Sequence, residues 1–178
     1  MGYNSFNGYV WNKLFDLQLI RENDIRFHAD YPACEDTMFV GSYLYHCSRV
    51  CVTEECLYCY RQVSGGANRG RYSGRKAYDP KWMSVFEMTE YMADLYKDDA
   101  VTAACRLHEV REAGIVLRSM EAAGYHGADH ARLKGILRRG AGLFFRDENS
   151  GRSQKLSVLL SCISPKLELA VWKLRNRK

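Results

Sequence analysis

The second half of the chain has apolar residues at helical spacing, and this pattern constrains the fold more than any other feature. Aspartate caps a first helical turn and proline suits the first helical position, so Asp79-Pro80 is a typical helix start. Apolar residues then recur at steps of three and four: Val85, Met88, Met92 and Leu95, and later Val110, Ala113, Leu117 and Met120. We expect helices throughout this half, with a stop at Gly124, a helix over 129–139 and a break over 140–151. A tail helix from about residue 153 should kink or restart at Pro165.

The first half predicts a mixture of short elements. Asp16 is a plausible cap for a helix that ends near Asn23. Glu35 and Asp36 precede an apolar run at helical spacing, which predicts a helix over about 35–47. The segments 49–52 and 56–61 are short and rich in β-formers, and we expect two strands there. The glycine- and arginine-rich stretch that follows, to about residue 79, predicts a mobile basic loop.

Five blocks in the first half occur in a recognisable order. They are G-Y-V-W-N-K-L-F at 8–15, L-I at 19–20, I-R-F at 25–27, E-D-x-x-F at 35–39 and L-Y-C-Y-R-Q at 57–62. This order resembles the C-terminal half of the catalytic domain of family-2 glycosyltransferases, over about residues 8–64. The resemblance implies a helix-rich α+β protein of the GT-A type. Its catalytic remnant would occupy 1–64, its Gly/Arg-rich loop 65–79 and its helical extension 80–178.

The acid pair is the expected catalytic centre. By resemblance Asp36 is the base that deprotonates the acceptor hydroxyl, and Glu35 orients the loop or the acceptor. Acids in a first helical turn lie near the positive end of the helix dipole, which keeps an aspartate ionised and able to accept a proton. The alternative for both residues is an ordinary acidic helix start.

Five further residues are expected to bind substrate. Trp11 could offer an apolar face to a sugar ring, but we favour the alternative that it packs in the core. Asn12 and Lys13 would line or brace the site. Arg61 and Gln62 open the basic loop, where a forked cation suits a diphosphate. The alternative is that this loop is a solvated linker. We expect Tyr58 and Tyr60 to be core residues with polar tips.

The donor half of such an enzyme is not recognisable in this sequence. The chain contains no Asp-x-Asp motif, so the Mn or Mg ion of the full enzyme would have its ligands outside this chain, and we expect no cofactor and no turnover from the chain alone. The expected function is therefore a fragment of an inverting glycosyltransferase, which moves a sugar from a nucleotide-sugar donor to a surface polysaccharide or lipid-linked acceptor. The alternative is a non-catalytic helical interaction module that retains a glycosyltransferase remnant.

Cysteine and histidine patterns predict no metal site. The seven cysteines, without a recognisable signal peptide, are expected to be reduced cytosolic thiols. Cys56 and Cys59 are three apart on an expected strand, so their sulfurs would point to opposite faces. His126 and His130 are four apart with a glycine between them, and we expect both at the surface.

Positive charge is concentrated in the tail. Residues 151–178 hold seven basic residues and one acid, whereas the rest of the chain has 19 basic and 20 acidic residues. The apolar stripe over 154–178, flanked by these charges, suits either the surface of an anionic membrane or packing on the preceding helices. A cytoplasmic protein at the inner face of the membrane is the expectation, with no transmembrane helix and no nucleic-acid partner.

Overall fold

The computed structural model describes residues 8–59, 61 and 78–176, and these residues form an all-α protein. Helices hold 67% of them and no strand occurs among them, so the α+β fold class expected from the sequence is wrong. The chain divides into two compact units, residues 1–62 with 83–102 and residues 63–82 with 103–178, which we describe in turn.

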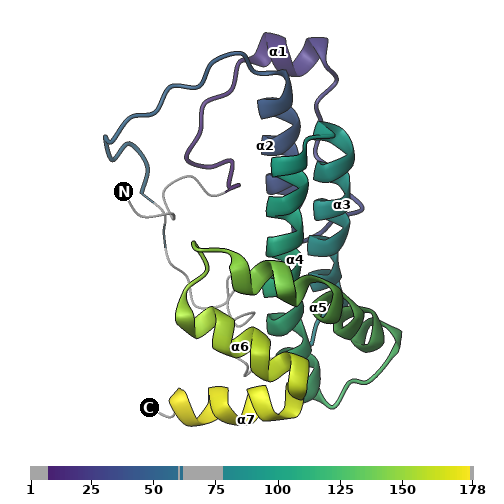
Figure 1. The fold of residues 1–178 in the computed structure, drawn as a ribbon. Coiled ribbons are helices and arrows are strands. Elements are labelled where there is room, and N and C mark those ends of the chain that lie inside the picture. The colour runs from purple at the N-terminus through teal and green to yellow at the C-terminus, as the bar shows by residue number, and fades with distance from the viewer. Residues whose placement is uncertain (1–7, 60, 62–77, 177–178) are drawn as a thin grey trace. The chain divides into compact units, whose positions relative to one another are not determined.

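The first unit is built around helices α2 (Glu35–His46) and α3 (Ser84–Tyr96), which pack side by side (Figure 1). Gly41 faces Met92 across this contact, since a Cβ there would lie 2.3 Å from the Met92 Cε. The Tyr96 hydroxyl donates to the Gly41 carbonyl at 2.8 Å, and the Ser42 and Tyr91 hydroxyls are 2.7 Å apart. Polar contacts thus fix the register of an otherwise apolar pair of helices.

A short helix, α1 (Leu17–Glu22), precedes α2 and confirms the expected cap. The Asp16 carboxylate accepts from the backbone N–H groups of Gln18 and Leu19. The Asp16 N–H in turn donates to the Tyr43 hydroxyl at 2.9 Å, which ties the start of α1 to α2. Phe15 meets the Phe39 ring edge-on at 5.3 Å and so extends the core of α2.

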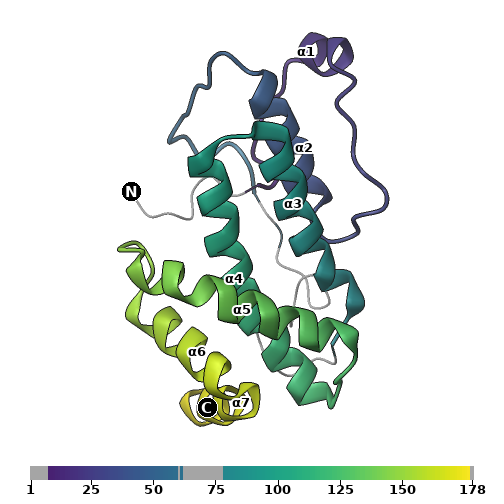
Figure 2. The same ribbon diagram turned by 45° about the vertical axis from the view of Figure 1, so that its right-hand side comes forward.

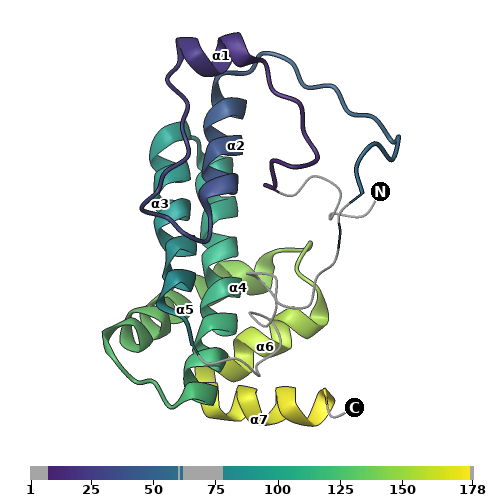
Figure 3. The ribbon, with the colours of Figure 1, turned by 180° about the vertical axis from the view of Figure 1, so that it is seen from behind.

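The two expected strands do not form. Residues 47–59 run as an irregular segment after α2, and no arrow marks that stretch (Figure 3). The β-forming side chains that motivated the prediction are largely exposed: Val50 at 64%, Val52 at 58% and Leu57 at 75%. A strand is stabilised by a paired neighbour and a covered face, and the described residues supply neither.

The second unit contains most of α4 (Asp99–Ala123), α5 (Ala128–Arg146), α6 (Arg152–Ile163) and α7 (Pro165–Arg175). Helix α5 packs on α6, and α6 packs on α7 (Figure 2). Before these helices, η1 (Pro80–Met83) is a single 3-10 turn that begins at Pro80 as expected. The core combines the inward face of α4 with apolar residues from the later helices: Val110, Ala113, Val116, Leu117, Met120, Leu133, Leu137, Phe144, Val158 and Leu169.

The helix ends in this unit follow the expected signals with one exception. Gly124 stops α4 with φ +68°, and Pro165 restarts the tail as the first residue of α7, where the Ser164 hydroxyl accepts from the Leu167 N–H. The expected break at 140–151 is wrong in its first half, because α5 continues through Gly140 to Arg146. A Cβ at Gly140 would lie 2.2 Å from the Val110 Cγ2, so this glycine serves helix packing and not a turn.

Candidate functional site

The expected acid pair lies in the first turn of α2. Glu35 and Asp36 are both half-buried, and the N-cap residue Cys34 makes no side-chain capping hydrogen bond. The two carboxylates are therefore the acidic groups nearest the positive end of this helix dipole.

The segment that carries Trp11, Asn12 and Lys13 runs past the same helix turn. A Cβ at Gly8 would lie 2.5 Å from the Thr37 Oγ1, so this segment contacts the helix one residue after Asp36. The contact brings two of the five sequence blocks together at one place. Gly8 is required there because a larger residue would push the segment off α2.

Lys13 is coupled electrostatically to Asp36. Burial lowers the pKa of the Lys13 ammonium from its ordinary value, and the Asp36 carboxylate opposes that change by raising it. The Lys13 Nζ donates to the Tyr9 carbonyl at 2.7 Å and to the Asn12 Oδ1 at 2.8 Å. The ammonium is thus held in a fixed direction near the catalytic candidate, and exposed Asn12 serves to hold it.

An aromatic surface adjoins these polar groups. Trp11 stacks with Tyr9, with ring centroids 5.7 Å apart, and with Tyr58 at 5.1 Å. Trp11 is only half-buried, and Tyr9 and Tyr58 are 41% and 54% exposed. The core positions we favoured for Trp11 and expected for Tyr58 are therefore wrong, and the three rings form a partly exposed aromatic stack.

The expected donor-binding residues do not join this group. Arg61 is exposed, and no contact within the described part of the chain links it to Asp36. Gln62, Tyr60 and the basic stretch 62–77 lie outside the described residues. The structure therefore assigns no diphosphate contact to them.

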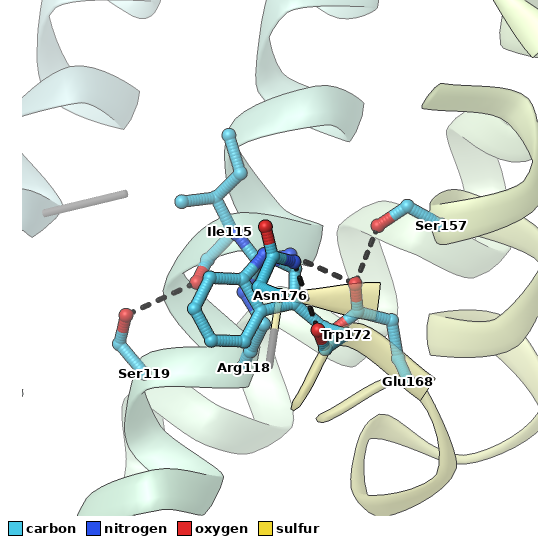
Figure 4. A network of polar contacts seen from close by, with 7 residues as sticks. All are labelled: Ile115, Arg118, Ser119, Ser157, Glu168, Trp172 and Asn176. Carbon is cyan, nitrogen blue, oxygen red and sulfur yellow. Dashed lines mark hydrogen bonds and ion pairs between the residues drawn. The ribbon is translucent and has the colours of Figure 1, made fainter. Parts of the chain in front are cut away.

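A second arrangement, in the second unit, was missed by the sequence reasoning. A cavity of about 560 Å³ is lined by residues of α4, α6 and α7, among them Arg111, Arg118 and Trp172. The Arg118 guanidinium donates to the Glu168 Oε1 at 2.8 Å and lies 5.0 Å from the Trp172 ring centroid (Figure 4). The Ser157 hydroxyl donates to the same carboxylate oxygen at 2.7 Å.

This pair is almost fully withdrawn from water. The Arg118 and Glu168 side chains are 7% and 3% exposed, and the Arg118 Nε and the Glu168 Oε2 have no hydrogen-bond partner among the described residues. A buried ion pair fixes the relative position of its two helices more surely than it adds net stability. Its partners are fifty residues apart in sequence, so no local pattern could have revealed it.

Of the two histidines expected at the surface, His126 is exposed as expected, whereas the expectation for His130 is wrong. The His130 side chain is only 13% exposed, and it meets Glu121 together with the half-exposed His126. The signal that could have found them is the spacing Glu-x4-His-x3-His across a glycine stop, at 121, 126 and 130.

Comparison of the chain with known protein families, curated proteins and solved structures finds no match. None of the helices in the described part of the chain combines the length and the apolar character that crossing a bilayer requires.

Proposed function

We propose that the chain carries the acceptor side and the catalytic base of an inverting glycosyl transfer reaction. The observation that carries the proposal is the electrostatic interaction of Lys13 with Asp36, together with the partly exposed stack of Tyr9, Trp11 and Tyr58 next to Lys13. The proposal concerns this site and not the fold class, since the described residues contain no sheet.

The site supplies the parts that an acceptor sugar needs. The C–H face of a sugar ring stacks on an indole or phenol ring, and the partly exposed rings of Tyr9 and Tyr58 would offer such faces beside Trp11. Asp36 would accept the proton of the acceptor hydroxyl. The hydroxyl oxygen would then form a bond to the anomeric carbon of a nucleotide-sugar donor while the bond from that carbon to the diphosphate breaks, which inverts the configuration.

Lys13 and Glu35 would support the base. The positive charge of the Lys13 ammonium would attract the Asp36 carboxylate and help to hold it in place. Glu35, the neighbouring half-buried acid, would orient the acceptor. A divalent metal does not fit here, because the Asp36 carboxylate already interacts with the positive charge of Lys13 and the chain has no Asp-x-Asp motif. No step in this proposal uses a metal.

The tail offers a surface suited to a lipid-linked acceptor. Several apolar residues of α6 and α7 are exposed, namely Leu156, Leu159, Ile163, Leu167 and Leu174. Lys155, Lys166, Lys173 and Arg175 lie among them in sequence, and a basic apolar surface of this kind binds anionic bilayers. We propose on this argument that the protein works in the cytoplasm, at the inner face of the membrane.

Saccharide binding tests the proposal directly. The three tryptophans, Trp11, Trp82 and Trp172, can be labelled as 5-fluorotryptophan and followed separately by ¹⁹F NMR. Titration with a panel of neutral oligosaccharides should shift the Trp11 resonance and leave the Trp172 resonance unchanged, and Trp11→Ala should abolish the binding. In a preparation that shows transfer, Asp36→Asn should lower turnover by roughly 10²–10⁴ while the Trp11 shift persists.

If no saccharide of the panel shifts the Trp11 resonance, the proposed acceptor site is refuted. That outcome would favour the second candidate, a non-catalytic helical interaction module. The observation on its side is the exposed apolar surface of α6 and α7, which a partner protein could equally cover.

A further inference from the structure

Three potential metal ligands meet where α4 turns into α5. Glu121 lies in the last turn of α4, His126 in the connection and His130 in the first turn of α5. The His130 Nε2 is 2.8 Å from the Glu121 Oε1, and the His126 Nδ1 is 3.8 Å from the same oxygen. The ligand atoms of all three side chains lie within 4.8 Å of one another.

Backbone hydrogen bonds hold the turn that brings these side chains together. The Tyr125 N–H donates to the Met120 carbonyl at 2.9 Å, the reversal that follows Gly124 with its φ of +68°. The His130 N–H donates to the Gly127 carbonyl at 3.1 Å. From the start of α5, Asp129 accepts from the Tyr78 hydroxyl at 3.2 Å. The ligands are therefore placed by the fold before any ion binds, which lowers the entropic cost of binding.

Their chemistry and spacing fit a tetrahedral transition metal. Zinc binds histidine nitrogen and carboxylate oxygen at about 2.0–2.2 Å, so two donors of one tetrahedral ion lie about 3.3 Å apart. The observed separations of 2.8 and 3.8 Å fall on either side of that value. The three ligand atoms lie within 4.8 Å of one another, so a small movement of the half-exposed His126 ring would complete the arrangement.

We propose that Glu121, His126 and His130 form a binding site for Zn²⁺ or a similar divalent transition metal, with one open position. Two histidines and one glutamate are a ligand set that leaves a fourth position for water or another ligand. The side chains border a hollow of about 340 Å³ that is also lined by Lys134, Ser164 and Lys166. These lysines oppose the ion's charge but attract an anion to its open position, so we assign that position to water or a small anion.

The alternative without a metal is that the His130–Glu121 contact is only a hydrogen bond between two helices. Such a bond would explain the burial of the Glu121 side chain, which is 5% exposed, without any ion. It would not require His126, whose side chain is 50% exposed and whose removal should then have no consequence. The two readings therefore differ in what His126 does.

Isothermal titration of the full chain with ZnCl₂, and optical titration with CoCl₂, test the proposal. We expect one ion per chain at this site and visible Co²⁺ bands typical of tetrahedral coordination. His126→Ala and Glu121→Gln should each weaken the binding at least tenfold, since even outer-shell changes at metal sites cost roughly 10–100-fold. His46→Ala, a change at an exposed histidine of the first unit, is the matched control and should leave the affinity unchanged.

The exposed thiols at Cys51, Cys56 and Cys59 compete for the same metals, so the titrations use a chain in which these three are serine. Helical circular dichroism before titration shows that each variant is folded. Loss of all binding in the chain with these three serines, or equal affinity in that chain and in its His126→Ala variant, would overturn the proposal. It is independent of glycosyl transfer, because every residue involved lies in the second unit.

Discussion

Gly140 offers a sharp test of the packing between α4 and α5. The change Gly140→Ala adds a Cβ that would lie 2.2 Å from the Val110 Cγ2, whereas carbon atoms in contact prefer about 3.5–4.0 Å. Val110 is 1% exposed and β-branched, so it cannot rotate away freely. We expect an overpacking cost of about 1–3 kcal/mol in the free energy of unfolding.

The higher helix propensity of alanine partly offsets the overpacking cost. Replacing glycine by alanine inside a helix gains about 0.8–1 kcal/mol, so the net effect of Gly140→Ala is smaller than the clash. Gly142→Ala separates the two contributions, because it lies in the same helix and its added Cβ would have no atom within 4 Å. We expect Gly142→Ala to stabilise the protein by about 0.5–1 kcal/mol.

Urea denaturation followed by far-ultraviolet circular dichroism measures both variants. The informative quantity is the difference between them, about 1–3 kcal/mol, from which helix propensity cancels. A double variant, Val110→Ala with Gly140→Ala, should lose less stability than the two single changes predict together, since the new methyl fills part of the space that Val110 leaves. If Gly140→Ala stabilised the protein as much as Gly142→Ala does, the close contact with Val110 would be refuted.

Three further outcomes are expected. Glu168→Leu should lower the free energy of unfolding by about 3–5 kcal/mol, because it leaves the buried Arg118 guanidinium without its partner, and adding Arg118→Met should restore most of that loss. If the losses of the two single variants simply add in the double variant, as measured by denaturation, the ion pair would be contradicted. Burial raises the pKa of the Cys162 thiol, although Arg138 opposes this change, so a smaller fraction of Cys162 is in the reactive thiolate form at pH 8. Iodoacetamide should therefore modify Cys162 more slowly than the exposed Cys59 at that pH. Mass spectrometry follows both modification rates, and the difference between the rates at Cys162 and Cys59 should become smaller as the pH rises. The chain should sediment with anionic vesicles at low salt and be released at high salt, and Ile163→Asp should reduce the sedimented fraction. If Ile163→Asp sediments as well as the unchanged chain, the exposed apolar residues of the tail do not bind the membrane.

The helices could be predicted from the sequence wherever a local signal marks their ends. Asp16, Gly124 and Pro165 act through their own backbone or the adjacent turn, and the structure places each where the local rule puts it. The error at Gly140 has the opposite cause. Its role depends on Val110, thirty residues earlier, so a local rule that treats glycine as a breaker fails there.

The strand prediction failed for a related reason. Val50, Val52 and Leu57 favour strands only when a neighbouring strand pairs with them, and the described residues provide none. In the candidate site, the sequence identified Asp36 as a candidate base at the start of a helix, and its role as a base stays a prediction. The spacing of His126 and His130 alone did not reveal their cluster, because the third member, Glu121, comes from the preceding helix and had to be included in the pattern.

The stacking of Arg118 on Trp172 bears on which sequence changes the protein can accept over evolutionary time. A lysine at 118 would keep the charge but lose both the planar stack and the forked geometry toward Glu168. Single substitutions at any of the three positions are therefore costly, whereas a combined replacement by apolar residues of similar volume is not. Divergent sequences of this fold should change positions 118, 168 and 172 together, and should otherwise keep all three unchanged.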